Sequence, residues 1–230
     1  MDVGLFIAAS GMVAEQTRQD QLSNDLANAS TPGYKPDSTP SHSFGELLLD
    51  NATTHQPIGS VSMGVALGKS YTDMAPEGMQ TTNEPLDFGI VGVGFFAVRT
   101  PQGLRYTRDG QFTTSAQGLL VDSSGDEVLD QGGAPIKVGV NGTVPASALG
   151  VFNVPNAVKL GENLFEGNAA GQAAGTVRSG VLEESGVDPA KVMVEMMGTL
   201  RTYQSGQQAI QAIDQTLGEA ASEVGSVSGS

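Results

Sequence analysis

Glycine is distributed so unevenly along this chain that the sequence must contain two kinds of structure. Of the 31 glycines in 230 residues, 22 lie between Ile58 and Val187, and the two ends hold few. Glycine weakens helix interiors, but it permits tight turns and close backbone packing. We therefore expect helical ends and a turn-rich middle.

The first thirty residues carry the pattern of an amphipathic helix. Their apolar residues recur at steps of three and four, which places them on one helix face. These residues are Leu5, Ala8, Ala9, Met12, Leu22, Leu26 and Ala29. The pattern stops at Pro32, which lacks an amide donor, and at Gly33, which tolerates positive φ. We predict one helix from about Val3 to Asn28.

The last forty residues carry a heptad pattern. Asp188 and Pro189 form a helix start signal. The seam then runs in alternating steps of four and three. It comprises Met196, Leu200, Tyr203, Gln207, Ile210, Asp214, Leu217, Ala221 and Val224, of which Gln207 and Asp214 are polar exceptions. So narrow a stripe needs partner helices. A hairpin with the first helix and a bundle with neighbouring copies both satisfy this need.

The middle of the chain predicts antiparallel strands. Short apolar runs of three to six residues are separated by turn sequences such as Thr100-Pro101-Gln102-Gly103. The expected fold class is α+β, with terminal helices paired as a coiled-coil-like bundle and a central, mainly antiparallel β domain. The expected division is a helix at 1–33, an extended connection at 34–79, a β-rich outer domain at 80–187, and a helix with its tail at 188–230. The connection is expected to hold at most one short helix, near Phe44 to Leu49.

The composition excludes several classes of function. Without cysteine the chain cannot form disulfides, thiolate metal sites or a cysteine nucleophile, and only His42 and His55 remain as imidazole ligands. A net charge of −14 disfavours nucleic acid and anionic membranes as partners. No apolar stretch is long enough to span a membrane. The amino terminus lacks the basic leader of a cleaved secretory signal.

Two motifs that could carry chemistry have simpler interpretations. Gly92, Gly94 and Ala97 match a dinucleotide-binding fingerprint, but no helix can follow before Pro101, so a bend between strands is favoured. An acidic cluster departs from calcium-loop spacing and reads as a hairpin turn. The cluster comprises Asp122, Asp126, Glu127 and Asp130. We therefore predict no catalytic, cofactor-binding or metal-binding residues and no enzyme activity.

The amino-terminal sequence resembles a known signature. Residues 8–12 read A-A-S-G-M, and residues 23–35 read S-N-D-L-A-N-A-S-T-P-G-Y-K. Bacterial flagellar rod and hook proteins typically carry A-S-G-M followed by N-N-L-A-N-x-x-T-P-G-[FY]-K. The matching positions are Asn24, Leu26, Asn28, Pro32 and Gly33. Asp25 departs from the signature, where the family has a second asparagine.

Two later segments resemble the same family. Residues 106–112 read Y-T-R-D-G-Q-F, similar to the family's Y-T-R-D-G-x-F and contributing Tyr106, Arg108, Asp109 and Gly110. Residues 180–188 read G-V-L-E-E-S-G-V-D, similar to G-x-L-E-x-S-N-V-D. They contribute Leu182 and Glu183, and Gly186 replaces the family's asparagine. At the Asp25 and Gly186 positions we expect local contacts to differ from those of the family.

The resemblance implies an axial subunit of the flagellar hook and basal body. Such subunits have paired terminal helices lining a tube and a β domain outside, and they are exported by the flagellar type III apparatus without a cleaved leader. The implied partners are copies of the chain, other rod and hook subunits, and the export apparatus. The implied location is the basal body, across the periplasmic space. The chain's length favours a rod subunit, proximal or distal, over a hook subunit. A β-rich surface binding module is the remaining alternative.

In a tubular assembly the apolar stripes of the end helices would form the contacts between subunits. The residues expected in this assembly interface are Leu5, Ala8, Met12, Leu22, Leu26, Met196, Leu200, Tyr203, Ile210 and Leu217.

Overall fold

The structure is a computed structural model that describes residues 2–43, 45–50, 57–161 and 163–227. The terminal helices pack together and the central region is antiparallel β, which confirms the α+β prediction. The chain divides into two compact units. Unit 1 comprises Met1–Leu26, Asp37–Tyr71 and Pro189–Ser230, and unit 2 comprises Ala27–Pro36 and Thr72–Asp188.

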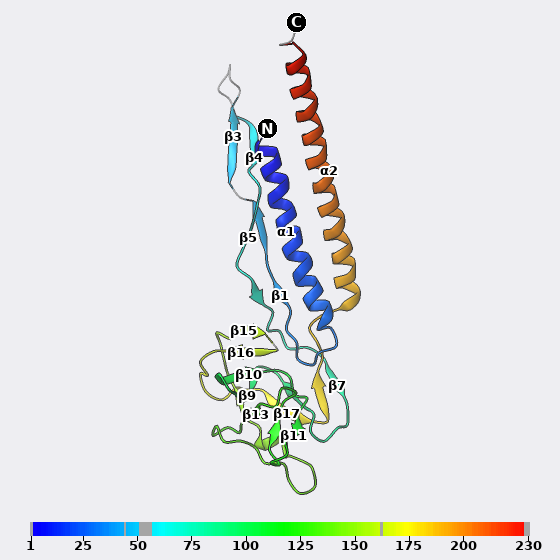
Figure 1. Ribbon diagram of the computed structural model, residues 1–230. Helices are drawn as coiled ribbons and strands as arrows, with labels where there is room; N and C mark the ends of the chain where they lie inside the picture. The colour runs from blue at the N-terminus through cyan, green and yellow to red at the C-terminus, as the bar shows by residue number, and fades with distance from the viewer. Residues whose placement is uncertain (1, 44, 51–56, 162, 228–230) are drawn as a thin grey trace. The chain divides into compact units, whose positions relative to one another are not determined.

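Two long helices dominate unit 1 and run antiparallel, side by side (Figure 1). Helix α1 spans Asp2–Ala27 and helix α2 spans Pro189–Val227. The predicted start of α2 at the Asp188-Pro189 signal is confirmed. Beyond α1 the chain turns, with the amide of Thr31 donating to the carbonyl of Asn28 at 3.0 Å. Gly33 then adopts φ of +64°, a left-handed conformation that glycine tolerates in turns.

The seam between the two helices differs in register from the predicted heptad. The Thr199 hydroxyl donates to Oε1 of Gln19, and a Cβ added at Gly206 would lie 2.8 Å from Cγ of Met12. The more buried positions of α2 are Val192, Met196, Thr199, Tyr203, Gly206, Ile210, Ile213 and Leu217. Every second position of the predicted seam is therefore wrong, because the seam uses the residue one place earlier in the sequence.

The shift in register is caused by two residues that are not large and apolar, so a search for apolar residues at heptad spacing does not find them. Thr199 and Gly206 take the places predicted for Leu200 and Gln207, because a hydrogen-bonding threonine and a small glycine allow the helices to approach closely. Ile213 likewise replaces Asp214. Leu200 is left 49% exposed, and Leu5 of the predicted α1 stripe is 42% exposed.

The described residues between Asp37 and Thr72 form three successive antiparallel strand pairs, which we call the ribbon. Strand β1 (Asp37–Ser38) pairs with β6 (Tyr71–Thr72), β2 (Ser41–Ser43) with β5 (Val65–Leu67), and β3 (Glu46–Asp50) with β4 (Pro57–Ser62). The short helix predicted near Phe44 to Leu49 is wrong for Glu46 onward, because that run pairs along its length with β4. Phe44 lies outside the described residues. A short apolar run suits either structure, and here cross-strand pairing decides.

Ser10 of the A-S-G-M element docks the ribbon on α1. Its hydroxyl donates to the carbonyl of Ile7 at 2.9 Å and accepts from the amide of Val65 at 3.2 Å. Gly64 has φ of +132°, and a Cβ there would lie 2.5 Å from Ser10 Oγ. Only glycine lets the ribbon come this close to the helix.

Unit 2 is built on an antiparallel sheet. Its strand order is β11 (Thr113–Thr114), β12 (Leu120–Val121), β13 (Glu127–Val128), β9 (Phe95–Thr100), β10 (Gly103–Thr107), β16 (Leu164–Glu166) and β15 (Val158–Gly161), and β14 (Val151–Phe152) also pairs with β9. Two further pairs join β17 (Thr176–Ser179) to β8 (Phe88–Val91) and β18 (Val181–Glu183) to β7 (Met79–Thr81). One 3-10 turn covers Ala146–Ala148.

The core of unit 2 holds nearly fully buried phenylalanines. Phe96 packs edge-on against Phe112 at 5.3 Å between ring centroids, and Phe95 packs against Phe165 at 5.3 Å. Gly92 and Gly94 have positive φ between β8 and β9, so the predicted bend between strands is confirmed.

The acidic cluster forms turns, as predicted. Oδ1 of Asp122 accepts from the amides of Ser124 and Asp126, between the paired strands β12 and β13. His42 is exposed on β2, whereas His55 lies outside the described residues. Within the described part of the chain, no helix is both long enough and apolar enough to cross a membrane.

Candidate functional site

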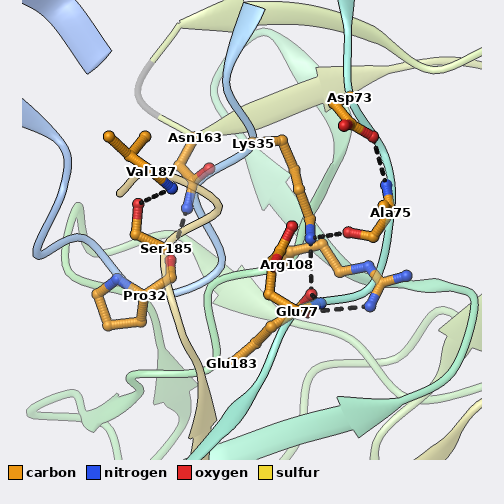
Figure 2. A network of polar contacts seen from close by, with 10 residues as sticks. All are labelled: Pro32, Lys35, Asp73, Ala75, Glu77, Arg108, Asn163, Glu183, Ser185 and Val187. Atoms are coloured by element: carbon orange, nitrogen blue, oxygen red, sulfur yellow. Dashed lines mark hydrogen bonds and ion pairs between the residues drawn. The ribbon is translucent and has the colours of Figure 1, made fainter. Parts of the chain in front are cut away.

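Three distant sequence motifs meet at a buried ion cluster in unit 2, formed by Lys35, Arg108 and Glu183. Lys35 Nζ lies 2.7 Å from Glu183 Oε1, and Arg108 Nη1 lies 2.9 Å from Glu183 Oε2 (Figure 2). The side chains are 1%, 3% and 0% exposed, respectively. Each residue belongs to a different family-like segment, so the motifs mark one structural feature.

The carboxylate of Glu183 is the centre of this cluster. It also accepts the amide of Glu77 at 3.0 Å, so three donors surround it. Lys35 donates in addition to the carbonyl of Ala75. Charges buried this deeply are tolerated only when they are paired and hydrogen-bonded. Removing Glu183 would leave two cations without a counter-charge in the interior.

Arg108 is held on two sides. Its guanidinium carbon lies 5.2 Å from the centroid of the Phe95 ring, which places the cation over an aromatic face. Its Nε has no hydrogen-bond partner among the described residues. The position of Arg108 is therefore set by Glu183 and by Phe95 packing.

Backbone contacts bind the same segments together. The Gly33 amide donates to the carbonyl of Glu183, and the Gly186 amide donates to the carbonyl of Tyr34, both at 2.9 Å. A Cβ on Gly33 would lie 2.4 Å from the carbonyl oxygen of Arg108, which explains the glycine of the T-P-G element. A Cβ on Gly186 would lie 2.8 Å from Pro36 Cδ. The departure from asparagine at this position therefore fits its tight surroundings.

Three side chains complete the junction. Ser185 Oγ donates to the carbonyl of Asn28 at 3.0 Å, and Asn163 Nδ2 donates to the carbonyl of Pro32 at 2.9 Å. Lys159 Nζ donates to the carbonyl of Lys35 at 2.7 Å and lies 4.0 Å from the Tyr34 ring centroid. These contacts fix the segment that follows α1 to Lys159, Asn163 and Ser185 of unit 2.

Asp109 and Gly110 close the turn beside this cluster. Oδ1 of Asp109 accepts the amide of Gln111 at 2.9 Å. A Cβ at Gly110 would lie 1.6 Å from the carbonyl oxygen of Phe88, so no other residue fits. Burial raises the pKa of Asp109 to about 6, with smaller contributions from the nearby carboxylates of Asp122 and Asp87.

Replacing Asp109 by asparagine is expected to stabilise unit 2 at alkaline pH. Asparagine keeps the Oδ1 acceptor for Gln111, but it does not bury a charge. Because the folded-state pKa is raised from 3.8 to about 6, the wild-type protein loses stability as the pH rises through that value. We expect Asp109→Asn to gain about 2 kcal/mol at pH 8 and little at pH 4. Urea unfolding across this pH range measures the difference, and a gain that does not vary with pH contradicts it.

The structure brings together most of the motif residues predicted from the sequence. Asn28, Pro32, Gly33, Arg108 and Glu183 all take part in the junction. Buried Leu182 lies in the same strand as Glu183. Asn24 and Leu26 lie on α1, which belongs to unit 1. Tyr106 is buried in the core around Phe165, and this burial raises its pKa above the ordinary value.

Sequence reasoning gave no role to Lys35, Asn163 or Lys159. The available signal was the charge pattern of the motifs, since a lysine ends one segment, an arginine lies in the next and a glutamate in the third. Among the described residues, no group of three histidine, aspartate or glutamate side chains could hold a metal ion.

A second feature lies in unit 1, where the helices leave large apolar side chains exposed. On α1 these are Val3, Leu5, Phe6 and Val13, with exposures from 42% to 61%. On α2 they are Met193, Val194, Met197 and Leu200, with exposures from 49% to 64%. Of the predicted assembly residues, Leu22 is buried in unit 1, and Ala8, Met12, Leu26, Met196, Tyr203, Ile210 and Leu217 are half-buried.

Comparisons with known families match three parts of the chain. Residues 5–35 match the flagella basal body rod protein family, and residues 89–159 match the D1 domain of the flagellar hook protein FlgE/F/G family. Residues 178–223 match the carboxyl-terminal region of the flagellar basal body rod FlgEFG proteins. The three matches include all three members of the buried ion cluster.

Whole-length relatives agree with these matches. The flagellar hook-basal body complex protein FlhO of Bacillus subtilis is 30% identical over 97% of this chain and 99% of its own length. The basal-body rod protein FlgF of Caulobacter vibrioides is 30% identical over 89% of this chain and 91% of its own. The rod protein FlgG of Buchnera aphidicola subsp. Acyrthosiphon pisum is 30% identical over 93% and 96%.

Proposed function

The chain belongs to the family of flagellar hook and basal-body rod proteins, and from this we propose that it is a structural subunit of the basal-body rod. Its named relatives are rod and hook-basal body proteins. In this proposal, copies of the chain assemble with one another and with other rod and hook subunits into a hollow tube. The tube transmits torque and passes exported subunits along its channel.

The observation that carries the proposal is the exposure of apolar side chains on both terminal helices. A helix face that holds Met193, Met197 and Leu200 at about half exposure is poorly hydrated and is typical of an interaction surface. The two faces do not cover each other within one copy, since both stay exposed there. A contact between unlike surfaces repeats from copy to copy and gives a filament or tube.

The junction in unit 2 supports a structural role. The segments that leave α1 and lead into α2 are joined there by the buried ion cluster and by backbone hydrogen bonds. A subunit that bears torque needs its chain crossings fixed, and paired charges at the centre of hydrogen-bond networks provide such specificity. The proposal assigns no catalytic residue. It includes export of the chain by the flagellar apparatus and a final position across the periplasmic space.

Deletion of the gene and complementation by variants test the proposed function. The full chain is expected to restore basal bodies and motility, whereas a chain lacking residues 1–30 is expected to restore neither, because it has lost α1 and its exposed apolar face. Swimming halos and electron microscopy of isolated basal bodies measure the two outcomes. Normal flagella with the truncated chain would contradict the proposal.

A further inference from the structure

Two of the exposed apolar surfaces in unit 1 have matching spacings. On α1, Phe6, Ala9 and Val13 line one side of a groove of about 370 Å³, whose other side is formed by Val65 and Leu67 of β5. We call the three α1 residues the α1 patch. On α2, Met193, Met197 and Leu200 are each about half exposed, and we call these the α2 patch.

The α1 patch and the α2 patch have the spacing of a short antiparallel coiled coil. Phe6, Ala9 and Val13 are separated by three and four residues, and so are Leu200, Met197 and Met193 when α2 is read backwards. In antiparallel helices this match places Leu200 on Phe6, Met197 on Ala9 and Met193 on Val13. The small Ala9 lies between Phe6 and Val13, which leaves room in the groove for the long Met197 side chain.

The two patches cannot meet within one chain, because the intramolecular seam fixes a different register. Met12 faces Gly206 and Gln19 faces Thr199, so Leu200 lies at the level of residue 18 rather than of Phe6. The α2 patch therefore lies twelve residues along the helix pair from the α1 patch.

We infer that the α2 patch of one copy docks on the α1 patch of a second copy, head to tail. This inference rests on the proposed rod function and specifies its contact. Moving Leu200 from the level of residue 18 to the level of residue 6 is a shift of twelve residues. At about 1.5 Å per residue, the second copy is displaced by about 18 Å along the helix axis.

The amount of apolar surface fits a repeating contact between identical copies. The ten exposed apolar side chains around the two patches range from 37% to 64% exposure. They are Val3, Leu5, Phe6, Val13, Val65, Leu67, Met193, Val194, Met197 and Leu200. At roughly 50 Å² each, burying these side chains removes about 500 Å² of apolar surface from water, well below the roughly 1,200 Å² of a stable pairwise interface. One contact is therefore weak, and stability comes from its repetition along the assembly.

The orientation of the helices also favours a second copy of the chain over an unrelated partner. The intermolecular contact uses the same two helices, in the same antiparallel sense, as the seam inside the chain. Each new copy therefore continues an existing layer of helices. The contact leaves one α1 patch and one α2 patch free at the ends of any row, so the row does not close by itself.

Cysteine cross-linking tests the register, because the natural chain has no cysteine. Val13→Cys in one copy and Met193→Cys in a co-expressed copy form a matched pair, as do Phe6→Cys and Leu200→Cys. The register-shifted control combines Val13→Cys with Leu200→Cys, which share the chemistry but are offset by seven residues, about 10 Å. A disulfide needs Cα atoms within about 7 Å, so the control pair is too far apart to link.

In the gene-deletion strain, mild oxidation is expected to link both matched pairs at least tenfold more than the control pair. Motility and basal-body content of the same cells report the proposed function separately. Basal bodies that form with equal linkage in all pairs, or with linkage in none, overturn the docking register and leave the rod function standing. Failure of the wild-type chain to enter basal bodies overturns the rod function and the contact together.

Discussion

Replacing Glu183 by alanine is expected to destabilise unit 2 by about 3–5 kcal/mol, the range observed when one partner of a buried ion pair is removed. The carboxylate is fully buried and is the counter-charge of Lys35 and Arg108, at 2.7 and 2.9 Å. Without it, two cations remain in the interior and the Glu77 amide loses its acceptor. Such a loss is a large fraction of the roughly 5–15 kcal/mol by which an ordinary domain is stable.

The neighbouring glutamate supplies a matched control. Glu184 is exposed, so Glu184→Ala removes the same charge from the same segment but leaves the buried ion cluster intact. We expect this control to change the unfolding free energy by less than about 0.5 kcal/mol. Urea unfolding followed by tyrosine fluorescence measures both variants. Similar stabilities for Glu183→Ala and Glu184→Ala would show that the cluster contributes little.

Replacing Leu200 by aspartate is expected to abolish assembly while leaving the isolated subunit folded. Leu200 is 49% exposed, so a charge there costs the free chain little, but in the assembly it is placed against the apolar side chain of Phe6. We expect complete loss of motility in the gene-deletion strain, together with a change of less than about 1 kcal/mol in the unfolding free energy of the monomer.

Two other substitutions on the same helix separate assembly from folding. Gln208→Asp adds the same charge to an exposed position beyond the α2 patch and is expected to preserve motility. Ile210→Asp places the charge in the seam of the helix pair and is expected to lower the helix content of the monomer by circular dichroism. Loss of motility with Gln208→Asp, or normal motility with Leu200→Asp, would count against the contact.

The sequence predicted the elements of the fold better than their contacts. Periodicity and capping residues located both helices, because an apolar stripe and the Asp188-Pro189 signal are local properties. The register of the seam could not be predicted in the same way. It depends on Thr199 and Gly206, which an apolar count ignores, and on where the partner helix offers Gln19 and Met12.

The candidate site shows the same limit. Family-like motifs indicated which residues matter, yet nothing local in the sequence showed that Lys35 and Glu183 lie 2.7 Å apart. Both side chains belong to residue types that are normally exposed, so their burial follows only from the tertiary arrangement. The strand β3 was missed for a related reason, since its pairing with β4 is a contact between segments.

The hydrogen bond between Lys35 and Glu183 joins residues 148 positions apart, and this separation has a kinetic consequence. Contacts so distant in sequence form late in folding, because the entropy of closing the intervening loop must be overcome first. Until β18 pairs with β7, β7 lacks its partner strand, and Lys35 and Arg108 lack the carboxylate of Glu183. Unit 2 therefore cannot complete its fold while either end is held elsewhere. Such delayed closure is what the proposed export requires, since an exported chain must stay unfolded until it reaches its destination.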